Sequence, residues 1–252
     1  MTGDSALVLV GHGSTRHPDG ALPVLALAED LRRRALFAEV AAIFMKQSPP
    51  LAAAETLVKA RTVFIVPVFA GKGYYTDTLI PREIGLTGQV TERDGRRFIY
   101  TEPAGTHRRI PGLLACRADG MARASGWAPG KTALLLIAHG SSRPGAAGET
   151  PRAIAAAIAA TGHFAEVALV FLEQEPKAED WSRMLTTRDV VALPLLVAQG
   201  MHASRDIPPL FGLNHGETGP VESQGHRVVL ATGIGAEPEL ADIIVEMVLA
   251  AR

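Results

Sequence analysis

The chain has 252 residues, 47% of them hydrophobic, and its 25 basic and 26 acidic side chains leave a formal net charge of −1. This balance is ordinary for a globular protein and excludes the basic surplus on which general binding of nucleic acid or anionic membranes depends. The single Cys116 excludes an internal disulfide framework, and with no signal-like or membrane-spanning run of residues it favours a cytoplasmic location.

Short apolar runs alternate with longer amphipathic ones along the first half, which is typical of a parallel sheet flanked by helices. The short runs predict strands at 6–11, 39–45, 62–69 and 97–102. The longer runs predict helices at 21–36, 49–60 and 108–124.

A Gly- and Pro-containing linker at residues 125–130 precedes a second series of the same kind. Its predicted strands are 132–138, 166–172, 189–197 and 227–231, and its predicted helices are 150–161, 177–185 and 237–251. We therefore predict an α/β chain of two tandem, similar half-domains, residues 1–127 and 128–252. Each half is expected to hold a four-stranded, mainly parallel sheet flanked by helices, with a cleft between the halves.

The two halves are an internal repeat. Residues 6–16, ALVLVGHGSTR, recur as ALLLIAHGSSR at 133–143, which is an offset of 127 residues. At the same offset EVAAIFMKQSP aligns with EVALVFLEQEP, and VPVFA aligns with LPLLV. The offset is constant over about seventy residues, so the similarity between the halves is not a chance match. It predicts the same architecture for both halves.

Ligands of parallel α/β sheets gather at the carboxyl ends of the strands, so the loops that follow strands are the candidate sites. Three such loops hold equivalent positions in the two halves, and the residues differ at two of them. The pairs are His12 with His139, Lys46 with Glu173, and Tyr75 with His202. Two imidazoles and a carboxylate suit divalent Co, Fe, Ni or Zn, whereas an ammonium group repels a cation. The second half is therefore the predicted metal site.

Two alternatives stay open at this site. Each histidine taken alone could equally order its loop by hydrogen bonding, and only the joint occurrence favours a metal. Glu175 could serve in place of Glu173, which lies two residues earlier.

Three segments of the second half together resemble a known family. They are LIAHGSSR, ending at Arg143, VFLEQEP at 170–176, and LPLLVAQGMHASRDIP at 193–208. They resemble the sirohydrochlorin cobaltochelatases and ferrochelatases, the small ATP-independent tetrapyrrole chelatases, and the resemblance covers nearly the whole chain as two copies. It implies that His139 and His202 bind the metal with Glu173 beside them. The first copy departs from the family pattern, which implies that His12 has lost a metal role.

The resemblance further implies insertion of a divalent metal into sirohydrochlorin or a related reduced tetrapyrrole, in cobalamin or siroheme biosynthesis. Co²⁺ is the first expectation and Fe²⁺ the second, and the metal is a substrate. His139 and His202 would act as ligands and bases and Glu173 would assist, because imidazole titrates near working pH. A two-copy chain can do alone what single-copy relatives would do as dimers, so we expect a monomer.

The many carboxylates of such a macrocycle need polar or cationic partners, although each candidate could equally be a solvated surface group. The candidate substrate-binding residues are Arg143, Arg205, Lys46, Lys72, Arg16 and His12.

Two alternatives concern nucleotide use and the class of function. The segment Gly130-Lys131-Thr132 is similar to the end of a phosphate-binding loop, but Ser125 occupies the first glycine position and the segment precedes a strand. We therefore expect no nucleotide cofactor. The competing function is a metal- or tetrapyrrole-binding carrier or sensor without turnover, which the altered first half motivates.

Overall fold

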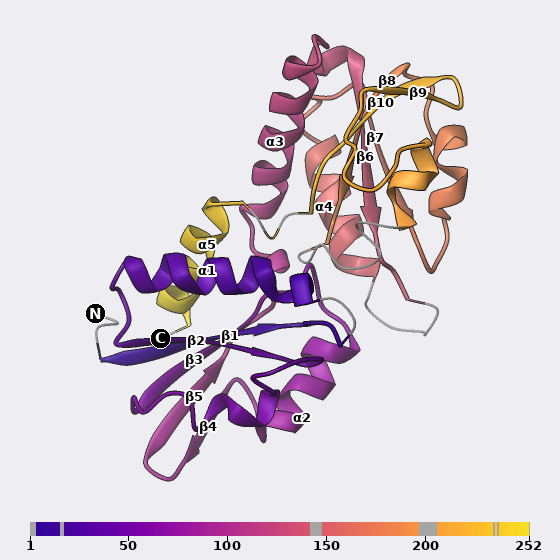
Figure 1. Ribbon diagram of the computed structural model, residues 1–252. Coiled ribbons are helices and arrows are strands. Elements are labelled where there is room, and N and C mark those ends of the chain that lie inside the picture. Colours follow the sequence, from indigo (N-terminus) through magenta and orange to yellow (C-terminus); the bar gives the residue numbers. More distant parts are fainter. Residues whose placement is uncertain are drawn as a thin grey trace. The chain divides into compact units, whose positions relative to one another are not determined.

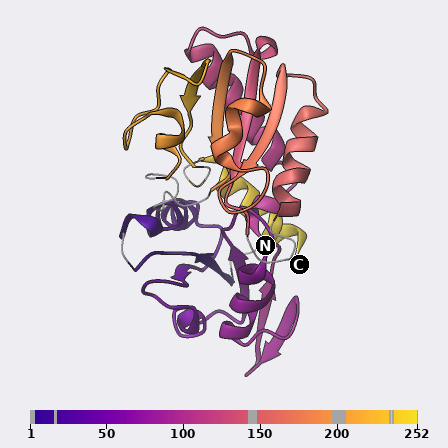
Figure 2. The same cartoon turned by 90° about the vertical axis from the view of Figure 1, so that its right-hand side faces the viewer.

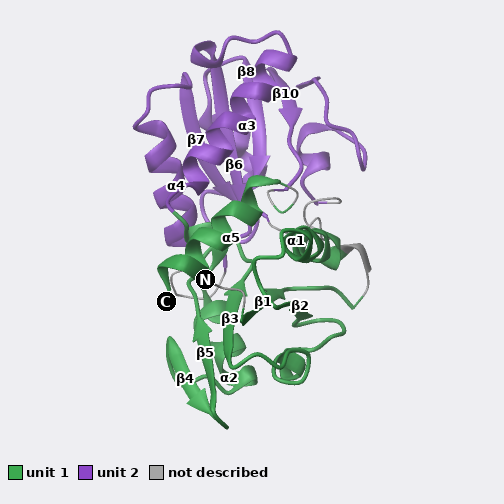
Figure 3. Cartoon of the chain, turned by 90° about the vertical axis from the view of Figure 1, so that its left-hand side faces the viewer, with its two compact units in different colours: residues 1–107, 235–252 green, residues 108–234 purple. Residues whose placement is uncertain are grey.

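The computed structural model describes residues 4–15, 18–141, 148–196, 206–233, 235 and 237–251. They form two compact units, shown in different colours in Figure 3. Unit 1 comprises residues 1–107 and 235–252, and unit 2 comprises residues 108–234.

The sheet of unit 1 has the strand order β2-β1-β3-β5-β4 within the described residues (Figure 1). Its strands are β1 (Ser5–Gly11), β2 (Glu39–Phe44), β3 (Thr62–Pro67), β4 (Val90–Arg93) and β5 (Arg96–Tyr100). Strands β1, β2, β3 and β5 are parallel, and β4 runs antiparallel to β5 at the edge.

Unit 2 repeats this topology in the order β7-β6-β8-β10-β9. Its strands are β6 (Thr132–Ala138), β7 (Glu166–Phe171), β8 (Asp189–Pro194), β9 (Val221–Ser223) and β10 (His226–Leu230). The predicted α/β fold of two similar halves is confirmed. The predicted number of four strands is wrong, because each described sheet gains an antiparallel edge strand, β4 or β9.

Both edge strands belong to tight hairpins. Asp94 and Gly95 have φ of 51° and 70°, and Gln224 and Gly225 have φ of 49° and 88°. Two successive left-handed residues make the turn type that matches the twist of antiparallel strands. The Asp-Gly pair was therefore a usable hairpin signal.

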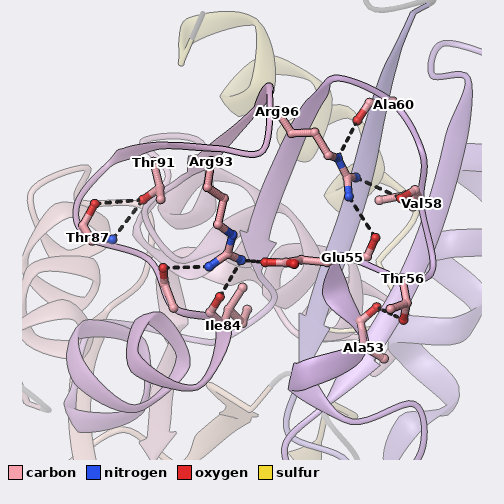
Figure 4. A network of polar contacts seen from close by, with 11 residues as sticks. Ala53, Glu55, Thr56, Val58, Ala60, Ile84, Thr87, Thr91, Arg93 and Arg96 are labelled. Atoms are coloured by element: carbon pink, nitrogen blue, oxygen red, sulfur yellow. Dashed lines mark hydrogen bonds and ion pairs between the residues drawn. The ribbon is translucent and has the colours of Figure 1, made fainter.

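Side chains from the first hairpin fasten it to unit 1 (Figure 4). Arg93 forms an ion pair with Glu55 and donates to the carbonyl oxygen of Ile84 at 2.8 Å. Arg96 donates to three carbonyl oxygens, those of Glu55, Val58 and Ala60. Both guanidinium groups also lie about 5 Å from the centre of the Phe98 ring. These bonds hold an edge strand that has few apolar side chains to bury.

The sheets are buried on both faces, as parallel sheets covered by helices are. All seven residues of β1 and all seven of β6 are buried. Alternate residues of β1 enter a core with Ile80, Ile84 and Phe98, and those of β6 enter one with Trp181 and Phe211. These cores fix the strands whose carboxyl ends carry the candidate site.

The helices are α1 (Leu22–Arg33), α2 (Ile80–Ile84), α3 (Ile110–Ala124), α4 (Glu149–Ala159) and α5 (Glu239–Ala250). Helix α3, the last helix of the first repeat, packs on α4 and β8 in unit 2 (Figures 1 and 2). Helix α5 packs on α1 in unit 1, where Arg34 contacts Asp242 at 2.5 Å.

The compact units therefore differ from the sequence halves, because each unit contains the last helix of the other repeat. The physical reason is the apolar face of each helix. In α5 it buries Leu240, Ile243, Ile244 and Val248. We keep 1–127 and 128–252 as a proposal for the two sequence repeats.

Two segments predicted as amphipathic helices form short 3-10 helices. The segments at 49–60 and 177–185 contain the 3-10 helices Leu51–Ala54 and Ala178–Met184. Their buried residues are Leu51 and Ala54 in the first and Ala178 and Trp181 in the second, three residues apart in each case. A 3-10 helix places residues i and i+3 on one side. It therefore buries both apolar residues of each segment without a longer α-helix.

The sequence prediction also missed α2 and the π-helical turn Tyr75–Leu79 that precedes it. The other predicted helices and all eight predicted strands are confirmed within a few residues. Among the described residues, no helix combines the length and the apolar character that crossing a bilayer requires.

Candidate functional site

His139 and Glu173 meet at the carboxyl ends of two neighbouring strands of unit 2. Ala138 at the end of β6 is paired with Phe171 at the end of β7. His139 follows Ala138 directly, and Glu173 follows Phe171 after one residue, Leu172. The Glu173 N–H donates to the carbonyl oxygen of His139 at 2.9 Å. This bond brings the side chains together, with 3.7 Å between His139 Nδ1 and Glu173 Oε2.

Both side chains remain accessible, since 38% of His139 and 48% of Glu173 is exposed. His139 Nδ1 also lies 3.3 Å from the carbonyl oxygen of Gly140. Either ring nitrogen of a neutral imidazole can be a metal ligand. The geometry therefore suits an imidazole that binds a metal beside the Glu173 carboxylate.

The loop around His139 is held in a conformation that requires glycine. Gly140 has φ of +73°, and a Cβ atom there would lie 2.7 Å from Gln174 Cγ. The Gln174 side-chain oxygen accepts a hydrogen bond from the Ser141 N–H at 3.0 Å. The two loops are thereby joined on both sides of the His139 and Glu173 pair.

Unit 1 has the same backbone frame with different side chains on it. The Lys46 N–H donates to the carbonyl oxygen of His12 at 3.0 Å. Gln47 accepts from the Ser14 N–H at 3.0 Å, and Gly13 has φ of +66°. Lys46 therefore has the backbone position that Glu173 has in unit 2, and its ammonium group does not favour a cation.

The third repeat position is seen in unit 1. The rings of His12 and Tyr75 meet edge to face, with 5.6 Å between their centres and 77° between their planes. The sequence alignment pairs Tyr75 with His202 and therefore predicts that His202 lies beside His139. His202 lies outside the described residues, and its place as the third ligand stays a prediction.

The predicted substrate-binding residues divide into two groups. His12 and Lys46 are exposed, and Lys72 forms an ion pair with Glu102 at 2.7 Å. Arg16, Arg143 and Arg205 lie outside the residues that the structure describes.

Glu175, the alternative to Glu173, makes a hydrogen bond within its own loop. Its Oε2 accepts a hydrogen bond from the Lys177 N–H at 3.2 Å. In the described part of the chain, no three His, Cys, Asp or Glu side chains form a group able to hold a metal ion. The described residues therefore place two of the three predicted ligands, His139 and Glu173, side by side, and their role as metal ligands stays a prediction.

Sequence reasoning missed the two glutamines. Gln47 and Gln174 follow the second repeat position directly and tie that loop to the histidine loop. Their signal was present in the alignment, because KQ in the first repeat matches EQ in the second.

Comparison with known proteins gives a consistent result. The model of the CbiX family matches residues 6–120 and again residues 133–251. A probable sirohydrochlorin cobaltochelatase of Halobacterium salinarum is 30% identical over 262 residues, which cover 96% of this chain and 89% of that protein.

Two solved structures are similar over nearly the whole chain. DR2241 of Deinococcus radiodurans, a multi-domain protein with structural similarity to chelatases, matches with a TM-score of 0.76 at 29% identity. The match covers 96% of this chain and 54% of DR2241, so the chain spans about half of that longer protein. CbiX, the terminal enzyme of siroheme biosynthesis in denitrifying bacteria, matches with a TM-score of 0.72 at 24% identity, covering 98% of this chain and 99% of that one.

Proposed function

Because the chain belongs to the CbiX family, we propose that it inserts a divalent metal ion into sirohydrochlorin or a related reduced tetrapyrrole. Co²⁺ is the favoured ion, since the relative of 30% identity is a probable sirohydrochlorin cobaltochelatase, and Fe²⁺ is the second. The product would serve cobalamin or siroheme biosynthesis. One observation carries the proposal, namely the accessible His139 and Glu173 pair at the ends of β6 and β7.

The metal would be held by His139, His202 and Glu173. Two neutral imidazoles and one carboxylate leave coordination positions open, so the ion can pass to the pyrrole nitrogens. The carboxylate of Glu173, 3.7 Å from the imidazole, offsets the charge of the ion. Its position supports Glu173 over Glu175, whose carboxylate accepts from the Lys177 N–H.

Insertion releases two pyrrole N–H protons, and these side chains can accept them. An imidazole that has given up the metal recovers a basic ring nitrogen, and the reference pKa of imidazole is about 6.5. Glu173 would accept the second proton or pass it to solvent, because 48% of its side chain is exposed. No covalent intermediate and no nucleotide is required for this exchange.

The side chains proposed to bind macrocycle carboxylates follow strands of each repeat. In unit 2 these are Arg143 and Arg205. In unit 1 they are His12, Lys46, Lys72 and Arg16. Lys46 supports this assignment best, since it is exposed on a loop that is bonded to the loop of His12. Lys72 would have to exchange Glu102 for a substrate carboxylate, which costs little at an exposed pair.

The test is an insertion assay with matched variants. The purified protein is incubated with sirohydrochlorin and Co²⁺ or Fe²⁺, and the absorbance change is compared with the uncatalysed rate. His139→Ala is expected to lower kcat/KM about 100-fold or more, because it removes a ligand and a base. His12→Ala, at the equivalent position of the other repeat, should keep Co²⁺ affinity within about threefold.

Equal insertion rates for the parent and for His139→Ala would contradict the site. A parent that binds Co²⁺ and sirohydrochlorin but never exceeds the uncatalysed rate would instead support a carrier or sensor. The carrier or sensor function is tested because the first repeat has Lys46 and Tyr75 where the second has Glu173 and His202.

A further inference from the structure

Two adjacent tyrosines stand exposed at the start of the π-helical turn Tyr75–Leu79 in unit 1. Tyr74 is 51% exposed and Tyr75 is 42% exposed, and their ring centres lie 6.0 Å apart. Tyr75 occupies the repeat position of His202, so it lies on a loop whose counterpart carries a predicted metal ligand. Single π-helical turns are frequent at functional sites.

A buried polar network fixes this turn. Thr76 is 2% exposed; its hydroxyl accepts from the Gly73 N–H at 3.0 Å and donates to Asp77 Oδ1 at 2.8 Å. The Tyr100 hydroxyl donates to the Thr76 carbonyl oxygen at 2.8 Å. Burial raises the pKa of Tyr100, which keeps this phenol a neutral donor at any ordinary pH. The backbone that carries Tyr75 is therefore held from inside the unit.

The ring of Tyr75 is positioned as well. It meets His12 edge to face at 5.6 Å, and His12 is itself fixed by a 2.9 Å contact between its Nδ1 and the Gly13 carbonyl oxygen. An exposed aromatic ring held in one place loses little conformational freedom when it binds a ligand. A large planar ligand can use such a ring, because planar groups such as nucleobases bind proteins by stacking on aromatic side chains.

We propose that Tyr75, assisted by Tyr74, is the surface of unit 1 on which the tetrapyrrole macrocycle stacks. The inference rests on the proposed function and adds to it a residue that binds the macrocycle plane. Lys46, on the loop bonded to that of His12, adds a positive charge for a macrocycle carboxylate.

The test measures binding of metal-free sirohydrochlorin by absorbance titration. Tyr75→Leu keeps an apolar side chain but removes the aromatic face, and it should weaken binding about tenfold. Tyr75→Phe keeps the ring and should bind within about twofold of the parent. Leu57→Ala is the control, because Leu57 is also 42% exposed in unit 1 and should have no effect.

Steady-state kinetics provide a reading that a general structural defect would not give. Tyr75→Leu should raise KM for the macrocycle about tenfold and leave kcat and the Co²⁺ dissociation constant unchanged. If that variant does not fold by circular dichroism, Tyr75→Trp replaces it and should bind at least as tightly as the parent.

The outcomes separate this inference from the proposed function. If the parent inserts metal and Tyr75→Leu binds sirohydrochlorin as tightly as the parent, stacking is wrong and the function stands. Equal losses in Tyr75→Phe and Tyr75→Leu would assign the effect to the hydroxyl group and also overturn it. A parent that neither binds nor converts sirohydrochlorin overturns both.

Discussion

Gly140 decides whether the His139 loop can form. Its φ of +73° costs about 1–2 kcal/mol for any L side chain, and a Cβ atom would also displace Gln174. Gly140→Ala is therefore expected to destabilise unit 2 by about 2 kcal/mol or more and to weaken Co²⁺ binding. Urea unfolding followed by tryptophan fluorescence measures this unit alone, because Trp127 and Trp181 are the two tryptophans of the chain and both belong to unit 2.

Gly162 offers a matched control for the steric part of this effect. It has φ of +63°, also lies in unit 2, and a Cβ atom added there would meet no atom within 4 Å. Gly162→Ala should cost about 1 kcal/mol and leave Co²⁺ affinity unchanged. If the two variants lost equal stability and equal affinity, contact with Gln174 would not be what holds the loop.

At the level of residues, the repeat made part of the site predictable. Comparing two copies at equal offset identified His139 and Glu173, and the structure places their side chains 3.7 Å apart. The roles of Gln174 and Gly140 could not be predicted in the same way. Both copies keep a Gln and a Gly at these positions, and only the folded structure shows that they contact each other.

At the level of elements, Glu166 joins the start of β7 to the chain that enters β8. Its carboxylate accepts from the N–H groups of Thr186 and Thr187, both at 3.0 Å, and from the Thr187 hydroxyl at 2.7 Å. Burial acts to raise the pKa of Glu166, but these hydrogen bonds outweigh it and leave the pKa below its ordinary value. The folded state therefore favours the ionised form.

This lowered pKa predicts a pH dependence. The stabilisation is complete above the unfolded pKa of about 4.3 and is lost as pH falls through the lower folded value. Glu166→Gln should lower the free energy of unfolding of unit 2 by about 1–2 kcal/mol at pH 7, and the difference from the parent should shrink below about pH 4. Urea unfolding by tryptophan fluorescence at several pH values measures it.

Glu179→Gln is the control, because Glu179 is an exposed carboxylate of the same unit. It should leave the unfolding free energy nearly unchanged at every pH. A Glu166→Gln deficit that stayed constant from pH 7 to pH 3 would show that charge at this position does not matter.

The elements themselves were predictable where burial determines them. The eight parallel-sheet strands have apolar runs that must be covered on both faces, so composition alone located them. Strands β4 and β9 were missed because they are short, and β4 is held by its turn and by Arg93 in place of a core. The helical character of 49–60 was overestimated, because only Leu51 and Ala54 need burial in its first turn.

At the level of the whole molecule, the two repeats share a fold and exchange their last helices. The exchange could not be predicted, because α3 and α5 both have an apolar face and local sequence does not determine the sheet on which that face packs. The family model matches both repeats. The repeats differ at Lys46 and Glu173 and at Tyr75 and His202, and we propose that these positions decide between metal and macrocycle binding.

This comparison predicts that the unit 1 site can be rebuilt. The backbone frames agree, with 3.0 Å from Lys46 N to His12 O and 2.9 Å from Glu173 N to His139 O. Lys46→Glu combined with Tyr75→His would therefore place a His, Glu, His set on the unit 1 loops. Isothermal titration with Co²⁺ should show an increase from about one ion per chain to about two, because an ammonium group is replaced by a carboxylate.

Two further variants make the result specific. Tyr75→His alone keeps the ammonium group and should bind about one ion, as the parent does. Adding His139→Ala to the rebuilt variant should remove the unit 2 site and return the count to about one. The rebuilt variant should also bind metal-free sirohydrochlorin more weakly, since it gives up the phenol ring of Tyr75. If it folds and still binds a single ion, the loops of unit 1 differ from those of unit 2 in more than their side chains.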